Sequence, residues 1–269
     1  MKSRSTTQTW IARSTPNPNA ALRLFCFPYA GGGSVVFHHW GAELPDDIEV
    51  CAVKLPGREN RLAEPPFDRI APLVQALAAG LSPYLDRPFA FFGHSLGGLV
   101  SFELMHELLR QRRPSPVHLL ISAMRAPHVP STIAPIHHLP TPDFIERLRD
   151  MKGTPEAILN NRDMMELMLP VLRADFAISE TYQPSAKAPL ACPITALCGL
   201  EDTIISEQAL HAWEQYTRHT FTVHNIAGGH FFIHSQRAEV LEKVGQTLMP
   251  YLSQSPSVAG HHRLKETHP

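Results

Sequence analysis

One short segment carries residue types that can do nucleophilic chemistry: Gly93-His94-Ser95-Leu96-Gly97-Gly98. It follows the apolar run Pro88–Phe92, which predicts a strand, and precedes a helical pattern that starts at Leu96. Glycine is expected on both sides of Ser95 because a Cβ there would collide with the neighbouring strand or helix. The turn would expose the hydroxyl at a helix N-terminus, which favours a developing negative charge. An ordinary Gly-Ser turn is the alternative, but it would not demand both glycines.

A serine is a weak nucleophile unless a base, held by an acid, takes its proton. After a turn of this kind, the acid and then the histidine follow the serine in the chain. Asp202 comes after the strand pattern Ile194–Cys198, and His230 comes after the strand pattern Phe221–Ile226. Both therefore fall at the carboxyl edge of the predicted sheet, where Ser95 also lies and where open α/β sheets bind ligands.

Other residues compete for these two roles. Glu201 is the alternative acid, and we favour Asp202 because it lies deeper in the loop and has the shorter side chain. His94 is a plausible base because it adjoins the serine, but consecutive residues at a tight turn point apart. No metal site is expected, since an HExxH motif is absent. Several of the 16 histidines are expected to be surface or packing residues: His38, His39, His137, His138, His211, His219, His224 and His234.

An anion formed at the reacting carbonyl would need two N–H donors. The Leu96 amide, directly after the nucleophile, is one candidate. The other is Ala30, with Tyr29 as its neighbour, in the glycine-rich loop 27–33 that follows an early strand. Three glycines let this backbone approach a substrate closely. Phosphate binding is the rival interpretation of such a loop, but no Gly-Lys-Ser/Thr follows it.

Apolar runs that alternate with helical patterns predict an α/β fold with a mostly parallel central sheet and helices on both faces. Most of the runs are continuous rather than alternating, as expected for strands covered on both sides. With the Ser95 turn, they indicate an α/β-hydrolase domain over residues 1–252, while the polar tail 253–269 is expected to be disordered. The predicted strands are Leu22–Phe27, Glu49–Leu55, Pro88–Phe92, Val117–Ser122, Ile194–Cys198 and Phe221–Ile226, and the predicted helices are Ile70–Leu81, Leu96–Arg113, Ser206–Tyr216 and Gln236–Leu252.

Residues 126–189 have no strand pattern and instead predict short capped helices. Thr141 and Thr154 open two of them, and Asp163 with Glu166 resembles a capping box for a third. The third is apolar on nearly every side, which predicts burial on both sides. We interpret this insertion as a helical lid; a packing subdomain without a binding role is the alternative. Four methionines could form an adaptable acyl-binding wall or could simply fill core: Met151, Met164, Met165 and Met168.

The composition excludes several classes of function. With 24 basic and 25 acidic residues the formal net charge is −1, so nothing favours a nucleic-acid or anionic-membrane partner. A hydrophobic fraction of 43% and a charged fraction of 18% indicate a folded globule. No stretch resembles a signal peptide or a membrane span, so a cytoplasmic protein is expected. The four cysteines form no CxxC pair and are expected to be buried thiols.

Five stretches together resemble the type II thioesterases, stand-alone α/β-hydrolases that serve polyketide and nonribosomal peptide synthases. They are FPYAGGG (27–33), LPGRENRL (55–62), GHSLGG (93–98), LPVLRADF (169–176) and GGHFFI (228–233). The resemblance implies that Ser95 is the nucleophile, Asp202 the acid and His230 the base, with the amides of Ala30 and Leu96 as the oxyanion hole. The family often has Gly-x-Asp-Asp where this chain has Gly199-Leu200-Glu201-Asp202, which bears only on the choice between the two acids.

The resemblance also implies the substrate, an acyl thioester on the phosphopantetheine arm of an acyl or peptidyl carrier protein. The implied role is editing, by hydrolysis of stalled or mis-primed acyl groups through an acyl-enzyme. The protein would need no cofactor of its own and would be a monomer. Arg58 and Arg61 could contact the phosphopantetheine phosphate or an acidic carrier helix, although solvation at the surface explains Arg61 more simply.

Two other functions fit part of the pattern. A free-standing carboxylesterase or lipase would share the same three side chains, so only the family-specific stretches oppose it. A non-catalytic carrier-docking subunit would not need a complete Ser-His-Asp set. Relative turnover of matched thioesters and oxygen esters distinguishes a carboxylesterase or lipase from a thioesterase. Loss of turnover on removal of Ser95 distinguishes an enzyme from a docking subunit.

Overall fold

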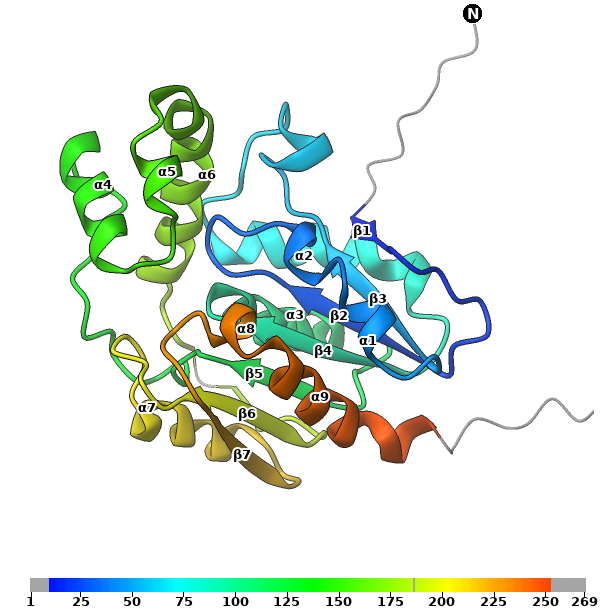
Figure 1. Ribbon diagram of the computed structural model, residues 1–269. Coiled ribbons are helices and arrows are strands. Elements are labelled where there is room, and N and C mark those ends of the chain that lie inside the picture. The colour runs from blue at the N-terminus through cyan, green and yellow to red at the C-terminus, as the bar shows by residue number, and fades with distance from the viewer. Residues whose placement is uncertain (1–9, 186, 253–269) are drawn as a thin grey trace, which may run out of the picture.

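The computed structural model describes residues 10–185 and 187–252. Within these ranges seven strands form one sheet, and all neighbouring strands are parallel except β1 and β3 (Figure 1). The spatial order is β1-β3-β2-β4-β5-β6-β7, which confirms the predicted fold class. The strands are β1 (Ile11–Ala12), β2 (Leu22–Phe27), β3 (Ile48–Val53), β4 (Phe89–His94), β5 (Leu119–Ser122), β6 (Ile194–Gly199) and β7 (Phe221–Ile226).

The predicted helices are present with differences at some ends, whereas the short helices α1 and α8 were not predicted, and α7 ends at His211. The helix expected to reach Arg113 stops at Arg110, because Arg112 has a left-handed backbone with φ of 54°. The helix expected to start at Ser206 instead uses that side chain as its N-cap. The α-helices are α1 (Trp40–Glu43), α2 (Ile70–Leu81), α3 (Leu96–Arg110), α4 (Thr141–Asp150), α5 (Glu156–Leu159), α6 (Arg162–Glu180), α7 (Glu207–His211), α8 (Phe232–Ser235) and α9 (Arg237–Leu252).

Helices cover both faces of the sheet because successive strand side chains point to opposite sides. Phe25 and Phe91 belong to the core cluster that includes α2 and α3, and Leu24 and Phe92 belong to the cluster that includes α1 and α9 (Figure 1). The central strands are therefore buried at every position, as expected for strands covered on both sides. The four cysteines are buried and unpaired, which confirms their interpretation as small core residues.

The helices α4, α5 and α6 lie between β5 and β6 in the chain and have an apolar cluster of their own (Figure 1). Two predictions about α6 were wrong. Its N-cap is Asn161, whose side chain accepts a hydrogen bond from the Met164 amide, so Asp163 lies inside the first turn. Met164 is 41% exposed and Leu167 is 49% exposed, so the helix is buried on one side only.

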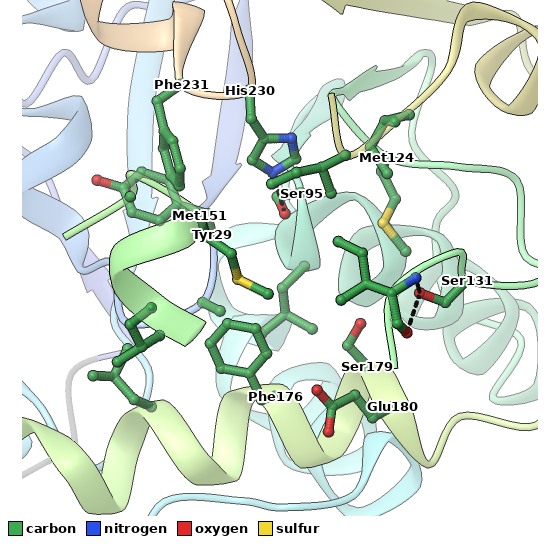
Figure 2. Close-up of a pocket in the computed structure, with 18 of the residues that line it drawn as sticks. Tyr29, Ser95, Met124, Ser131, Met151, Phe176, Ser179, Glu180, His230 and Phe231 are labelled. Atoms are coloured by element: carbon green, nitrogen blue, oxygen red, sulfur yellow. Dashed lines mark hydrogen bonds between the residues drawn. The ribbon is translucent and has the colours of Figure 1, made fainter. Parts of the chain in front are cut away.

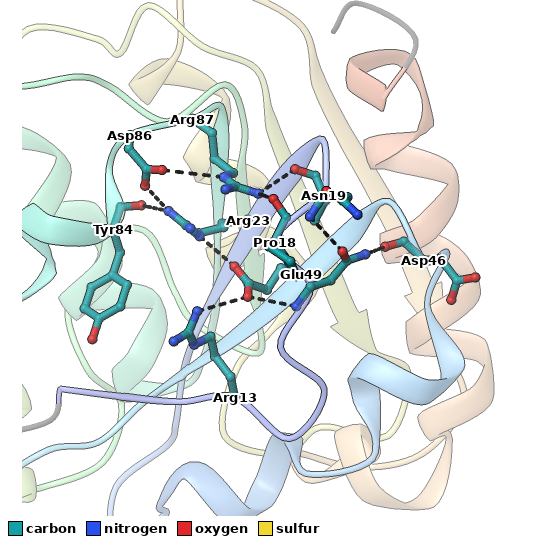
Figure 3. Close-up of polar contacts among 11 residues, drawn as sticks. Arg13, Pro18, Asn19, Arg23, Asp46, Glu49, Tyr84, Asp86 and Arg87 are labelled. Carbon is teal, nitrogen blue, oxygen red and sulfur yellow. Dashed lines mark hydrogen bonds and ion pairs between the residues drawn. The ribbon is translucent and has the colours of Figure 1, made fainter. Parts of the chain in front are cut away.

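A buried charge cluster lies at the amino ends of β2 and β3 (Figure 3). Glu49 is 1% exposed and accepts hydrogen bonds from Arg23 Nε at 2.7 Å and Arg13 Nη1 at 3.1 Å. Burial alone would raise the pKa of Glu49, but the bonds from Arg23 and from the Asn17 amide outweigh it and lower the pKa. Arg23 pairs with Phe89, the first residue of β4, so this cluster lies at the opposite edge of the sheet from Ser95.

We expect Glu49→Gln to lower the free energy of unfolding by about 3 kcal/mol and to leave turnover unchanged, because it removes the buried partner of Arg23. Urea unfolding with a parallel activity assay would measure both. Since the pKa of Glu49 is lowered by folding, its stabilisation is complete above the unfolded carboxyl pKa and is lost as the pH falls through the folded pKa. The variant and the parent should therefore converge in acid. Equal stability of the two proteins at pH 7 would contradict this account.

Candidate active site

Ser95 occupies the sharp turn between β4 and α3. Its backbone has φ of 52° and ψ of −122°, and its amide donates to the Ser122 carbonyl at 2.8 Å. A Cβ on Gly93 would overlap the backbone of Gly97, and a Cβ on Gly97 would overlap the carbonyl of Phe27. The two glycines are therefore present for the close approach that the sequence pattern predicts.

The structure brings Ser95, His230 and Asp202 into one hydrogen-bonded line. His230 Nε2 lies 3.0 Å from Ser95 Oγ, and His230 Nδ1 lies 2.8 Å from Asp202 Oδ2. A carboxylate can only accept, so Nδ1 carries the proton and Nε2 is free to accept one from the serine. The other Asp202 oxygen accepts from the amides of Ile204 and Ile205 at 2.8 and 3.0 Å, which fixes the carboxylate. The arrangement has the order of contacts that activates a serine nucleophile.

The two competing residues lie elsewhere. Glu201 is exposed, while the Asp202 side chain has no exposed surface. His94 is buried, donates from Nε2 to the His230 carbonyl at 2.9 Å, and accepts at Nδ1 from Ser122 Oγ at 2.8 Å. Burial, and next the charge of His230, lower the pKa of His94 well below its usual value. A neutral His94 with both nitrogens engaged holds the His230 backbone and makes no contact with the serine hydroxyl.

The two predicted amide donors, Ala30 and Leu96, line the same pocket as Ser95. Leu96 is the first residue of α3, so its N–H has no acceptor within the helix. In the glycine-rich loop, the Gly31 amide donates to Asp175 and the Gly32 amide donates to the Tyr29 carbonyl. Among the described residues, the Ala30 amide has no hydrogen-bond acceptor, which leaves it available to a ligand.

A pocket of about 120 Å³ opens beside Ser95 and His230 and continues under the helices of the insertion (Figure 2). Its walls are mostly apolar and come from the ends of β2, β4 and β5, from α4 and α6, and from the loops after β6 and β7. Such a shape suits the tail of an acyl group whose carbonyl carbon lies at the serine. The principal apolar wall residues are Met124, Ile133, Leu148, Met151, Leu172, Phe176, Ile204 and Phe231.

Only one of the four predicted wall methionines, Met151, lines this pocket. Met165 is buried in the core of the insertion, Met168 packs against that core, and Met164 faces outward. The assignment of these three to the wall was wrong. Met165 and Met168 lie on the same side of α6 as the pocket residue Leu172 but about one to two turns nearer the N-terminus of the helix, where they fill the core of the insertion. Sequence reasoning also missed Met124, although it lies just past the carboxyl end of β5, where pocket residues are expected.

The two arginines considered for phosphate binding are both buried and occupied. Arg58 pairs with Asp175 and donates to the Gly32 carbonyl. Arg61 pairs with Glu64, donates to the Lys54 carbonyl at 2.8 Å, and lies over the Trp10 ring. Neither guanidinium is available to a phosphate or a carrier helix, so the expected contact is wrong for this conformation.

Within the described residues, no group of three or more histidine, cysteine or acidic side chains could hold a metal ion.

A mostly parallel sheet with a serine at the strand–helix turn, and with Asp202 and His230 after its last two strands, defines the α/β-hydrolase class. The family model described as "Thioesterase domain" matches residues 22–248. The gramicidin S biosynthesis protein GrsT of Aneurinibacillus migulanus is 42% identical over 233 residues, which cover 87% of this chain and 91% of GrsT.

Two solved structures are similar at a TM-score of 0.81. The RedJ thioesterase from the prodiginine biosynthetic pathway of Streptomyces coelicolor is 37% identical, with 87% of this chain and 94% of that chain covered. The type II thioesterase BorB from the borrelidin biosynthetic cluster is 34% identical, with 89% and 98% covered. The chain therefore belongs to the thioesterase family, among the type II thioesterases, which confirms the resemblance seen in its motifs. It is a serine hydrolase. Its described part contains no helix with the length and hydrophobicity of a membrane span.

Proposed function

We propose that this enzyme hydrolyses acyl thioesters held on the phosphopantetheine arm of carrier proteins and so removes stalled or mis-primed acyl groups from a polyketide or nonribosomal peptide synthase. The observation that carries the proposal is the line of hydrogen bonds from Ser95 through His230 to Asp202 at the mouth of an apolar pocket. The names of the relatives place them in biosynthetic pathways for gramicidin S, prodiginine and borrelidin.

The first half of the reaction acylates the enzyme. Ser95 Oγ bonds to the thioester carbonyl carbon as its proton moves to His230 Nε2, and the carbonyl electron pair moves to oxygen. The amides of Ala30 and Leu96 donate to this oxyanion. When the intermediate collapses, the C–S bond breaks and His230 gives its proton to the departing sulfur. A thiol is a good leaving group, so the protein mainly has to supply an activated nucleophile and a preorganised anion site.

The second half releases a free acid. A water molecule gives a proton to His230 and attacks the acyl-enzyme carbonyl, and collapse of the second intermediate breaks the bond to Ser95 Oγ, which recovers the proton. Asp202 keeps Nδ1 protonated throughout and stabilises the imidazolium that forms twice. The helices α4–α6 act in this proposal as a lid over the acyl pocket, within a single domain of residues 1–252. The enzyme works as a cytoplasmic monomer without a cofactor of its own, and its partner is the carrier protein.

A panel of acyl-loaded carrier proteins, read by mass spectrometry of the carrier, tests this function. We expect loss of the acyl group and recovery of the free phosphopantetheine thiol, with kcat/KM higher for the carrier thioester than for a matched oxygen ester. A large preference for the oxygen ester would instead support a free-standing carboxylesterase.

Asp202→Asn should lower kcat by about 10⁴-fold, the loss seen when the acid of a Ser-His-Asp set becomes an amide. The amides of Ile204 and Ile205 donate to one Asp202 oxygen, so they would select the asparagine rotamer that points its NH₂ at His230 Nδ1. The imidazole would then carry its proton on Nε2 and could not accept one from Ser95. Steady-state kinetics with Glu201→Gln as the matched control measures the effect. A larger loss in the control would assign the acid role to Glu201.

A further inference from the structure

A buried ion pair joins the loop after β3 to helix α6. Arg58 Nη2 lies 2.8 Å from Asp175 Oδ1, and Arg58 Nη1 lies 2.9 Å from Asp175 Oδ2, so the guanidinium fork meets both carboxylate oxygens. Arg58 is 8% exposed and Asp175 is 1% exposed. Buried charges of this kind are retained when paired, but breaking the pair is costly, so the two side chains hold their segments firmly together.

The same pair also binds the loop that carries Ala30. Asp175 Oδ2 accepts from the Gly31 amide at 2.7 Å, and Arg58 Nη1 donates to the Gly32 carbonyl at 2.7 Å. The residue after Arg58, Glu59, continues the contact by accepting from Ser34 Oγ. Consecutive backbone groups of the loop are thus fixed by the ion pair.

Helix α6 carries both Asp175 of this ion pair and part of the wall of the acyl pocket. Leu172 and Phe176, which flank Asp175 on the helix, both line the pocket. Gly31 has φ of 76°, and a Cβ on it would come within 2.5 Å of Leu172 Cδ2. The loop therefore packs directly against the pocket wall, and Asp175 joins the two at the point of contact.

We propose that Arg58 and Asp175 are positioning residues that aim the Ala30 N–H at the developing oxyanion. The inference rests on the proposed function, because it takes Ala30 as one of the two donors. Asp175 holds the Ala30–Gly31 peptide group through the Gly31 amide and so restrains the rotation of Ala30 about its Cα–C bond. Arg58 holds the Gly32 residue, whose amide in turn donates to the carbonyl of the Tyr29–Ala30 peptide group that carries the Ala30 N–H. These two residues do not touch the substrate. They act through the backbone of residues 30–32, so they serve the transition state and not the binding of the acyl chain.

The decisive variant replaces the pair by apolar side chains of similar size, Arg58→Met with Asp175→Leu. Such a replacement of a buried ion pair is often neutral for stability, so the fold should be kept while the anchor of the Gly31 amide is lost. Removal of one oxyanion donor costs about 10²–10³-fold in kcat, so a misaimed donor should cost about 10–10²-fold. We expect KM for an acyl-pantetheine thioester to stay within about twofold.

A second measurement separates positioning from a merely structural role. An alkylboronic acid that bonds to Ser95 Oγ mimics the tetrahedral intermediate, so its affinity should fall by the same factor as kcat, whereas affinity for the carboxylic acid product should not change. The matched control is Arg61→Met with Glu64→Leu, a bidentate pair in the same segment that does not touch the loop. We expect it to keep kcat and boronate affinity. Arg58→Lys keeps the positive charge but not the two-pronged guanidinium, so its losses of kcat and of boronate affinity should be intermediate.

Clear results would overturn the inference. The positioning role is wrong if the Arg58/Asp175 double variant keeps kcat and boronate affinity. It is also wrong if the Arg61/Glu64 control loses as much kcat and boronate affinity as that double variant. If the double variant does not fold, Arg58→Lys decides, and full kcat with full boronate affinity in that variant contradicts positioning. Ser95→Ala in the same assay tests the proposed function separately, since an inactive Ser95→Ala beside a fully active double variant would refute only the role of the pair.

Discussion

Replacing Ser95 with alanine should lower kcat by about 10⁶-fold and leave the fold intact. The hydroxyl forms no part of the core, and among the described residues it hydrogen-bonds only to His230 Nε2. Without the oxygen no acyl-enzyme forms, and only binding and the anion site can still assist direct attack by water. Steady-state hydrolysis of an acyl-pantetheine thioester would measure the loss, and far-UV circular dichroism would check the fold.

Ser101→Ala is the matched control for this experiment. Ser101 lies on α3, the helix that begins directly after Ser95, is buried, and donates to the Gly98 carbonyl at 2.9 Å. Its removal should leave kcat within a few fold of the parent. Mass spectrometry of the parent enzyme quenched during turnover should show the acyl mass on the peptide that contains Ser95. Turnover that survives Ser95→Ala would show that another group is the nucleophile.

The three side chains could be predicted from the sequence because each follows directly from a local pattern. Ser95, Asp202 and His230 all come just after an apolar strand, and parallel strands bring their carboxyl ends to one edge of a sheet. The two strands that precede Asp202 and His230 match their predicted ranges within one residue. Parallel topology alone therefore places the three residues near one another, without any knowledge of the loops between them.

The contacts of Arg58 could not be predicted in this way because its partner is 117 residues further along the chain. One feature pointed to the pair: Asp175 is an acid among Leu172, Ala174 and Ile178 on the apolar side of a helix. A buried carboxylate needs a cation or hydrogen-bond donors, and the arginines of the segment LPGRENRL were available for that role. Interpreting those arginines as ligands for phosphate overlooked the unmatched charge on α6.

The pocket wall was only partly predicted, for a related reason. Which side of α6 faces the serine depends on how the whole insertion docks on the sheet, and hydrophobicity does not distinguish the two sides of a helix that is apolar all round. Met164 and Leu167 are exposed, whereas Leu172 and Phe176 line the pocket. Met165 and Met168 lie on the same side as Leu172 but about one to two turns earlier in α6, so their position along the helix places them in the core of the insertion.

Replacing His230 with alanine should be about as damaging as replacing Ser95, close to 10⁶-fold in kcat, because serine and histidine act as one unit. His94→Leu should cost only about tenfold. That change removes one bond to the His230 carbonyl, and a loss near 1.4 kcal/mol corresponds to tenfold. Leucine fills most of the volume of the imidazole, so the comparison is not dominated by a cavity.

The pH dependence of kcat/KM distinguishes the two histidines further. Because burial lowers the pKa of His94 well below its usual value, His94 stays neutral where His230 acts, and its removal changes no charge beside the base. The acid limb of the profile should therefore keep its midpoint in His94→Leu, with only the plateau lowered. A displaced acid limb in that variant, or a greater loss in it than in His230→Ala, would transfer the role of base to His94.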